Sequence, residues 1–291
     1  MSWRTVIITN TCKLSYKNNY MIIKNDKLEM IHLSEINTLI IDTTMVSITS
    51  YLLCELVNRK IKVIFCDEQR NPISELVPYY GAHNTSKKVL QQIKFNEEIK
   101  DLVWKEIVKF KIINQSKILQ NNINRGVDKL LSYVEEVKPG DITNREGHAA
   151  KVYFNFLFGK SFTRDLIIDT NFALNYGYSI LLSTFNKEIV SKGYITQLGI
   201  NHKNEFNYFN LSCDLMEPFR PLIDNIAFKN KGKYFDSDYK IKLVNVLNEK
   251  VKFDGKEQYV SNAVNLYVKS VFDALEKNDV SLLKNIDIEI I

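Results

Sequence analysis

The sequence is poor in cysteine, proline and glycine. Its 291 residues include 4 Cys, 5 Pro and 10 Gly. So little Pro and Gly excludes collagen-like and linker-dominated chains, and 45% hydrophobic residues suffice for a folded core. Cys12, Cys54, Cys66 and Cys213 stand far apart and form no C-x-x-C pair, which excludes the redox and zinc motifs built on that spacing. The sequence therefore predicts an ordered globular protein whose cysteines are small apolar residues.

Long apolar runs are also missing. The longest uncharged stretch, residues 170–186, contains Asn171, Asn175 and Gly177. It is too short and too polar for the roughly 20 apolar residues that a membrane-spanning helix needs. The first residues alternate polar and apolar side chains instead of forming the apolar stretch of a secretory signal. We expect no membrane segment and a cytoplasmic location.

Charge alone indicates no function. The 39 basic and 34 acidic residues leave a net charge of +5 and a sequence pI near 8.8. This is below the pI above 9 that would by itself indicate nucleic-acid binding. On composition alone, a Lys-rich solvated surface is the better interpretation.

The length predicts about two domains, and the pattern of hydrophobic residues changes near residues 78–84. Before this point, residues 5–9, 20–24, 38–42 and 62–66 form short β-branched or alternating runs, and residues 44–56 have helical spacing. After it, helical patterns follow one another, at residues 89–113, 116–137, 146–158, 164–192, around 218–228, and 259–277. We expect an α+β protein with a β-rich domain at residues 1–80, a linker at 81–87 and an all-α-helical catalytic domain at 88–291.

Two apparent sites can be set aside. Residues 159–161, Gly-Lys-Ser, imitate the end of a phosphate-binding P-loop, but the motif needs Gly where this chain has Phe154, and no strand precedes it. His148 lies two positions from Glu146, about 200° around a helix, so the two cannot easily share a ligand site. His32 and His83 lie outside the helical domain and near no acidic cluster, which leaves His202.

Glu146 has two interpretations. It ends the sequence Thr-Asn-Arg-Glu at residues 143–146, which matches a helix capping box, and taken alone that structural role is favoured. It also lies at the end of a core-facing stripe with Ala150, Tyr153 and Leu157. A carboxylate in that position is costly unless it is hydrogen-bonded or bound to a cation.

His202 and a pair of acids form the other candidate group. His202 follows Gly-Ile-Asn in a loop, where an isolated histidine is most often solvated. Asp214 and Glu217 are three residues apart, so a helical turn places both on one side. They could equally be acids near a helix N-terminus, with Pro218 in its first turn. Taken singly, these residues leave both interpretations open.

Taken together, the residues resemble the CRISPR-associated integrase family, the universal spacer-acquisition endonuclease of CRISPR adaptation. The resemblance rests on Glu-Gly-His-Ala-Ala at residues 146–150, on His202, and on Asp-Leu-Met-Glu-Pro-Phe-Arg-Pro at residues 214–221 with Asp224. This last run and the short chain look similar to members from type II systems. The likeness spans the chain, because the family has a small N-terminal β domain and a larger α-helical one.

The resemblance implies which residues form the site. Glu146, His202 and Glu217 correspond to the family's three metal ligands, and Asp214 to an accessory acid close to the ion. Arg220 is a weaker candidate, for contact with a DNA phosphate. Two carboxylates and one imidazole suit Mn²⁺ or Mg²⁺, and the histidine favours manganese, although ligand type alone leaves zinc open.

The resemblance also implies a reaction and partners. The 3′-hydroxyl of a short double-stranded prespacer DNA attacks a phosphodiester at the edge of a CRISPR repeat, and no nucleotide cofactor is needed. Expected partners are both DNAs, a second copy of the chain, and a small ferredoxin-like CRISPR-associated protein, with the N-terminal domain making dimer or partner contacts. The Lys-rich residues 87–117 could contact phosphates. Two alternatives are a non-catalytic DNA-binding scaffold and a metal-dependent phosphoesterase of another substrate.

Overall fold

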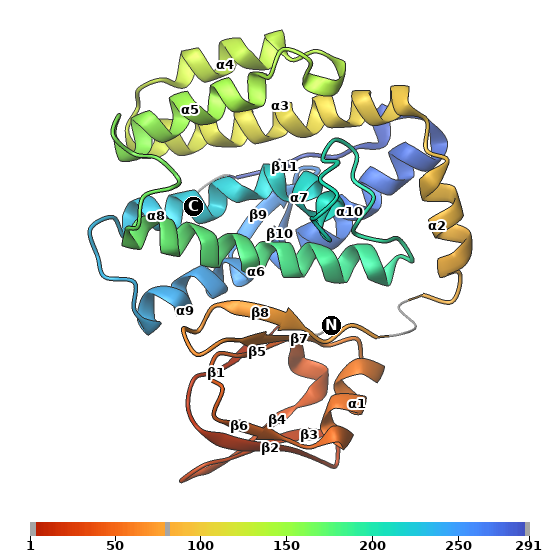
Figure 1. Cartoon of the computed structure of the whole chain (residues 1–291), viewed down its shortest axis with the longest axis vertical. Coiled ribbons are helices and arrows are strands. Elements are labelled where there is room, and N and C mark those ends of the chain that lie inside the picture. Colours follow the sequence, from red (N-terminus) through yellow and green to blue (C-terminus); the bar gives the residue numbers. More distant parts are fainter. Residues whose placement is uncertain (1–3, 79–81, 289–291) are drawn as a thin grey trace. The chain divides into compact units, whose positions relative to one another are not determined.

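The computed structural model describes residues 4–78 and 82–288, and the chain divides into two compact units, Met1–Gly81 and Ala82–Ile291 (Figure 1). The first unit is rich in β-strands and the second is mostly helical. The predicted α+β class is therefore confirmed. Residues 79–81 of the expected boundary lie outside the described part of the chain.

The first unit consists of two four-stranded sheets. The first sheet has the order β1-β5-β7-β8, formed by Arg4–Ile8, Ile36–Ile41, Lys62–Cys66 and Pro72–Glu75. The second has the order β4-β3-β2-β6, formed by Leu28–His32, Tyr20–Lys24, Cys12–Lys17 and Val46–Ile48. Apolar side chains of both sheets, such as Leu14, Met21 and Leu39, form one buried core with Leu52 and Leu56 of α1 (Ser50–Asn58).

The expected helix at residues 44–56 is only partly right. Val46–Ile48 forms β6, which pairs in parallel with β2, and α1 begins only at Ser50. Thr49 sets this boundary, because its side chain accepts a hydrogen bond from the backbone N–H of Leu52 and so caps the helix. Val46 and Ile48 are β-branched residues that suit the strand before the cap.

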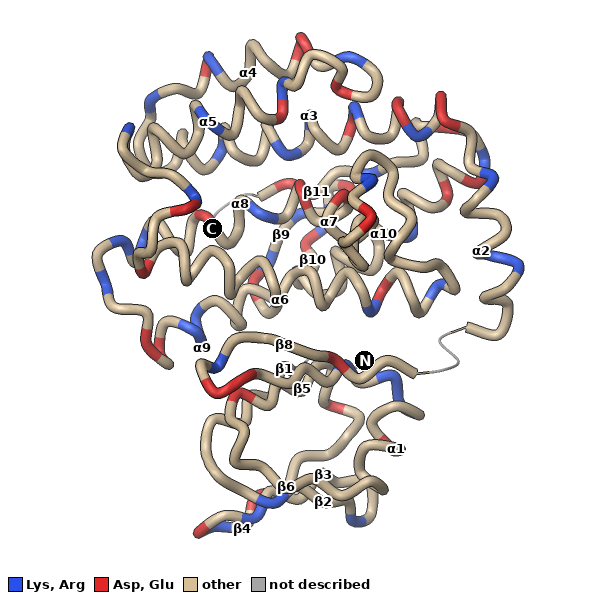
Figure 2. Tube along the Cα trace, viewed as in Figure 1, with Lys and Arg blue, Asp and Glu red and all other residues tan. Residues whose placement is uncertain are grey.

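The second unit is built around two long helices. Its α-helices are α2 (Thr85–Ile93), α3 (Glu97–Asn122), α4 (Val127–Glu136), α5 (Arg145–Phe158), α6 (Asp169–Ser191), α7 (Asn210–Met216), α8 (Arg220–Lys229), α9 (Ser237–Asn245) and α10 (Val260–Lys277). Figure 1 shows α4 and α5 lying along α3, while α6 runs beside α8 and α9. Figure 2 shows basic and acidic residues interspersed along α3.

Several helix boundaries differ from the sequence predictions. The predicted helices at 89–113 and 116–137 are instead α2, α3 and α4, so residues 85–87 of the expected linker are helical. Asn96 caps α3 through the N–H of Glu98, and Gly126 takes the left-handed conformation, φ 77°, just before α4. The predicted helix at 164–192 begins only at Asp169.

The second unit also contains a small sheet that the sequence did not predict. Its order is β10-β9-β11, formed by Lys256–Tyr259, Lys250–Phe253 and Ile286–Asp287. These strands are very short, and β9 and β10 form a hairpin through Asp254 and Gly255, which both have positive φ. The expectation of an all-α-helical domain is corrected by this sheet. None of the helices in the described ranges is long and apolar enough to span a membrane.

Candidate active site

Glu146 lies in the first turn of α5, and three side-chain contacts fix this helix end. The N-cap is Asn144, whose Oδ1 accepts from the N–H of Gly147 at 3.2 Å. Asp141 accepts from the N–H groups of Arg145 and Glu146 at 2.8 and 2.9 Å. A Cβ on Gly147 would lie 2.7 Å from Asn144 Oδ1, so the cap needs glycine there. The predicted capping box, with Thr143 as the cap, is wrong, and the Glu146 carboxylate is free to point elsewhere.

Asp214, in α7, organises the loop that carries His202. Its carboxylate is fully buried and accepts from the N–H groups of Ile200, Asn201 and His202 at 2.6, 3.0 and 3.1 Å. Gly199 is required beside it, because a Cβ there would lie 2.3 Å from the His202 carbonyl oxygen. Asp214 therefore does not serve a helix N-terminus, the interpretation that the sequence had left open.

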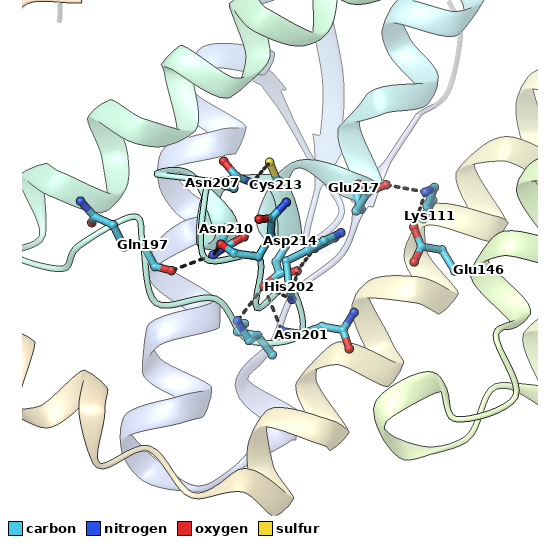
Figure 3. A network of polar contacts seen from close by, with 12 residues as sticks. Lys111, Glu146, Gln197, Asn201, His202, Asn207, Asn210, Cys213, Asp214 and Glu217 are labelled. Atoms are coloured by element: carbon cyan, nitrogen blue, oxygen red, sulfur yellow. Dashed lines mark hydrogen bonds and ion pairs between the residues drawn. The ribbon is translucent and has the colours of Figure 1, made fainter. Parts of the chain in front are cut away.

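Asp214 also contacts the imidazole of His202, through Oδ1 and Nδ1 (Figure 3). This hydrogen bond raises the pKa of His202, with the negative charges of Asp214, Glu217 and Glu146 adding to it and partial burial opposing it. Trp104 of α3 packs edge-on against the ring, with centroids 5.9 Å apart. The ring is thus held from two sides, and Nδ1 is already engaged.

Glu217 lies directly after α7, at the start of the 3₁₀ turn η3 (Glu217–Phe219), and is almost completely buried. Its Oε1 lies 2.8 Å from Arg220 Nε, and the Arg220 guanidinium stacks 4.6 Å from the ring centre of Tyr178. Burial opposes ionisation of Glu217, but the charges of Arg220 and Lys111 outweigh it and lower the pKa of this carboxyl. Glu217 is therefore a buried carboxylate.

The two candidate glutamates meet at a lysine that the sequence analysis missed. The Lys111 ammonium, from the middle of α3, lies 2.6 Å from Glu146 Oε1 and also pairs with Glu217 Oε2 (Figure 3). Burial lowers the pKa of Lys111, but Glu146 and Glu217 outweigh burial and raise it to about 12. The available signal was that Lys111 follows Ile107 by four residues on the core-facing side of α3, where a lysine is unusual.

A second buried acid, Asp224, is affected by the charge of Arg220. Asp224 of α8 accepts a hydrogen bond from the Tyr178 hydroxyl, and both residues are buried. Burial raises the pKa of Asp224 to about 6, against the effects of Tyr178 and Arg220. The Arg220 charge therefore acts on two carboxyl groups, by direct contact with Glu217 and at longer range on Asp224, and its contact with a DNA phosphate stays a prediction.

The structure gathers the predicted residues only partly into one ligand set. Glu146 and Glu217 share one cation position, whereas His202 is bonded to Asp214 beside them (Figure 3). Across residues 4–78 and 82–288, no three His, Cys, Asp or Glu side chains are placed to hold a metal ion as they stand. A cavity of about 550 Å³ adjoins His202, lined also by Lys100, Lys203 and Tyr208.

Comparison with known proteins identifies the family. A family profile described as "CRISPR associated protein Cas1" matches residues 5–253. The chain belongs to the Cas1 family. The CRISPR-associated endonuclease Cas1 of Neisseria meningitidis serogroup C is 35% identical over 226 residues, which cover 77% of this chain and 74% of the relative. The prediction of a CRISPR-associated endonuclease is confirmed at the level of family and enzyme class, and the type II assignment stays a prediction.

Solved structures share the Cas1 fold. A casposase bound to integration product matches with a TM-score of 0.76 at 21% identity, covering 97% of this chain and 93% of that one. A chain of a Cas6-RT-Cas1–Cas2 complex matches with a TM-score of 0.72 at 20% identity. That match covers 96% of this chain but only 36% of the other, so this chain spans about a third of its length.

Proposed function

We propose that this Cas1 chain inserts short double-stranded prespacer DNA into a CRISPR array. In the reaction, the 3′-hydroxyl of the prespacer attacks a phosphodiester at the edge of the repeat. One phosphodiester bond forms and another breaks. The leaving 3′ oxygen takes up a proton, so the released repeat-flanking strand ends in a new 3′-hydroxyl and the exchange needs no nucleotide cofactor. The observation that carries the proposal is the convergence of Glu146 and Glu217, from separate elements, on one buried cation position.

The residues present fit a divalent cation. Glu217 Oε2 is buried and faces the Lys111 ammonium, which marks a cation position between the two glutamates. His202 donates its Nδ1–H to the Asp214 carboxylate, which leaves Nε2 as the nitrogen for a ligand. A carboxylate on the far nitrogen is the usual support for a metal-bound histidine. Asp214 therefore fits a supporting role better than a place on the ion itself.

We assign Glu146, Glu217 and His202 as the residues that would hold Mn²⁺ or Mg²⁺. Such an ion, when bound, polarises the scissile phosphate, lowers the pKa of the attacking hydroxyl and neutralises charge on the leaving oxygen. Asp214 orients the imidazole and fixes the backbone of its loop. Arg220 holds Glu217 in its ionised form and limits its movement.

DNA binding and assembly are further parts of the proposal. Lys87 and Lys94, on and just after α2, are exposed and could contact phosphates without reading sequence. Insertion into both strands requires two active sites at a fixed distance, which a symmetric dimer provides. We propose a homodimer that works with a small ferredoxin-like partner through the N-terminal unit. The Cas6-RT-Cas1–Cas2 neighbour supports a Cas2 partner.

The test is an integration assay with labelled prespacer, repeat-containing DNA and Mn²⁺. We expect strand transfer by the wild-type chain and at least about a 100-fold loss in Glu146→Ala, His202→Ala and Glu217→Ala, because metal ligands matter at least as much as their supports. All three variants should still bind duplex DNA. Full activity of all three would refute the site. Salt-dependent DNA binding without strand joining would favour a non-catalytic DNA-binding scaffold. Cleavage of small phosphoesters alone would favour a metal-dependent phosphoesterase of another substrate.

A further inference from the structure

Lys111 differs from the other lysines of α3 in its surroundings. Its side chain is only 9% exposed, and its ammonium lies between two carboxylates that come from α5 and η3. Lys109, two positions earlier on the same helix, has a partly exposed side chain 3.7 Å from Glu106 one turn away. Surface pairs of the Lys109 kind contribute little. The buried position of Lys111 needs a different explanation.

The charges around Lys111 balance without any added ion. The carboxylates of Glu146 and Glu217 contact two cations, Lys111 and Arg220. A divalent ion placed between the same two carboxylates would lie against an ammonium in a region of low dielectric, where like charges repel strongly. The ion and the ammonium therefore compete for one position. Lysine suits such an exchange, because its charge is at the end of a flexible four-carbon stem.

We propose that Lys111 is a tethered counter-ion that occupies the cation position between Glu146 and Glu217 until a divalent ion displaces it. The inference rests on the metal site of the proposed function. In the ion-free chain the ammonium holds the two carboxylates close together, so the site is assembled before the ion arrives. Lys111 is thus a positioning residue: it holds the two carboxylates in place for the ion. Because it competes for the same position, it also lowers the affinity of the site for that ion.

The test measures Mn²⁺ binding to the full chain by calorimetry, in the absence of DNA. Lys111→Gln removes the competing charge, and we expect it to bind Mn²⁺ at least about tenfold more tightly than wild type. Lys109→Gln, the same change on the same helix, should stay within about twofold of wild type. Equal or weaker Mn²⁺ binding by Lys111→Gln would overturn the proposal.

A second measurement needs no folded variant. The wild-type chain is labelled with ¹³C and ¹⁵N, and the Lys111 side-chain signal is assigned through NMR correlations to its own backbone amide. Saturation with Mg²⁺ should shift the Lys111 signal, because its ammonium leaves the two carboxylates, and leave the Lys109 signal in place. A Lys111 signal that stays fixed at saturating Mg²⁺ would contradict displacement.

Glu146→Gln separates failure of this inference from failure of the proposed function. Mn²⁺ binding that is weakened by Glu146→Gln but indifferent to Lys111→Gln would overturn the counter-ion role and leave the metal site standing. Mn²⁺ binding that is unaffected by Glu146→Gln would place the metal elsewhere and overturn both. Weakening by Glu146→Gln together with tightening by Lys111→Gln supports both.

Discussion

Two buried lysines, Lys62 in the first unit and Lys111 in the second, behave in opposite ways. Lys62 of β7 is 5% exposed and pairs with Glu75 of the neighbouring strand β8. Burial lowers the pKa of Lys62, and the single carboxylate does not fully offset it. Lys111 is buried to a similar degree, yet Glu146 and Glu217 together raise its pKa to about 12.

The difference shows what each pair is for. One carboxylate beside a buried lysine makes a structural ion pair, which contributes little net stability because both charges lose their hydration. Two carboxylates around one ammonium provide more negative charge than a single lysine needs. Arg220 is required to balance it. Two carboxylates that converge on one ammonium are the arrangement of a cation-binding site, whereas Lys62 pairs with the single carboxylate of Glu75.

The largest expected effect comes from removing each lysine. Lys111→Met removes the ammonium from both Glu146 and Glu217 and should lower the free energy of unfolding by about 4 kcal/mol, whereas Lys62→Met removes it from Glu75 alone, for about 3 kcal/mol. Urea unfolding in EDTA, with Trp3→Phe as background so that buried Trp104 reports on the helical unit, measures the first loss. Circular dichroism follows the second. A smaller loss of unfolding free energy for Lys111→Met than for Lys62→Met would contradict the distinction between the two lysines.

The next effect concerns Asp224, a buried carboxyl that shares Arg220 with Glu217. Its folded pKa of about 6 exceeds the ordinary aspartate pKa of 3.8, so the folded state binds the proton more tightly. Stability should therefore fall as pH rises from about 4 to about 6, by on the order of 3 kcal/mol at ~1.4 kcal/mol per pH unit.

Asp224→Asn keeps an acceptor for the Tyr178 hydroxyl but cannot ionise. Unfolding of both proteins at pH 4 and pH 7 gives the test. We expect the variant to gain stability relative to wild type between these two values. An unchanged difference would show that Asp224 is ionised throughout, with Arg220 as its main partner.

The sequence located the acids and the histidine but not the contacts among them. Glu146, His202, Asp214 and Glu217 were found because their order and the residues around them resemble a family. Lys111 was missed because α3 carries many lysines, and only the helix packing shows which of them faces inward. Likewise, the contact between Asp214 and the His202 loop depends on a chain reversal at Gly199 that spacing does not reveal.

The fold class was predictable from the hydrophobic patterns of the strands and helices. Alternating runs gave β1, β3, β5 and β7, and long apolar stripes gave α5 and α10. Strands β9 and β10 were missed because they are four residues long, rich in Lys, and held by one hairpin. The helix boundaries at Asn96 and Gly126 depend on local caps that interrupt an otherwise continuous helical pattern.

A smaller effect is expected at the support of the histidine. Asp214→Asn removes the carboxylate from His202 Nδ1 and should weaken Mn²⁺ binding by about 10- to 100-fold, as loss of a supporting hydrogen bond does at metal sites. Calorimetry measures the affinity, and circular dichroism checks that the loop change leaves the helical unit folded. Full Mn²⁺ affinity in a folded Asp214→Asn variant would remove Asp214 from the site.

The smallest effect is expected from replacing both members of the structural pair. Lys62→Met combined with Glu75→Met should change the free energy of unfolding by less than about 1 kcal/mol, because an apolar pair of similar volume avoids the loss of hydration. Integration activity should stay at the wild-type level. A loss of several kcal/mol would show that the Lys62 pair is more than a structural contact.

The most direct test of the metal site is a crystal structure of the chain with Mn²⁺, using anomalous scattering to locate the ion. We predict one strong peak within roughly 2.0–2.4 Å of carboxylate oxygens of Glu146 and Glu217 and of His202 Nε2, with the Lys111 ammonium moved away. An ion bound at other residues, with Lys111 still between the two glutamates, would contradict the account.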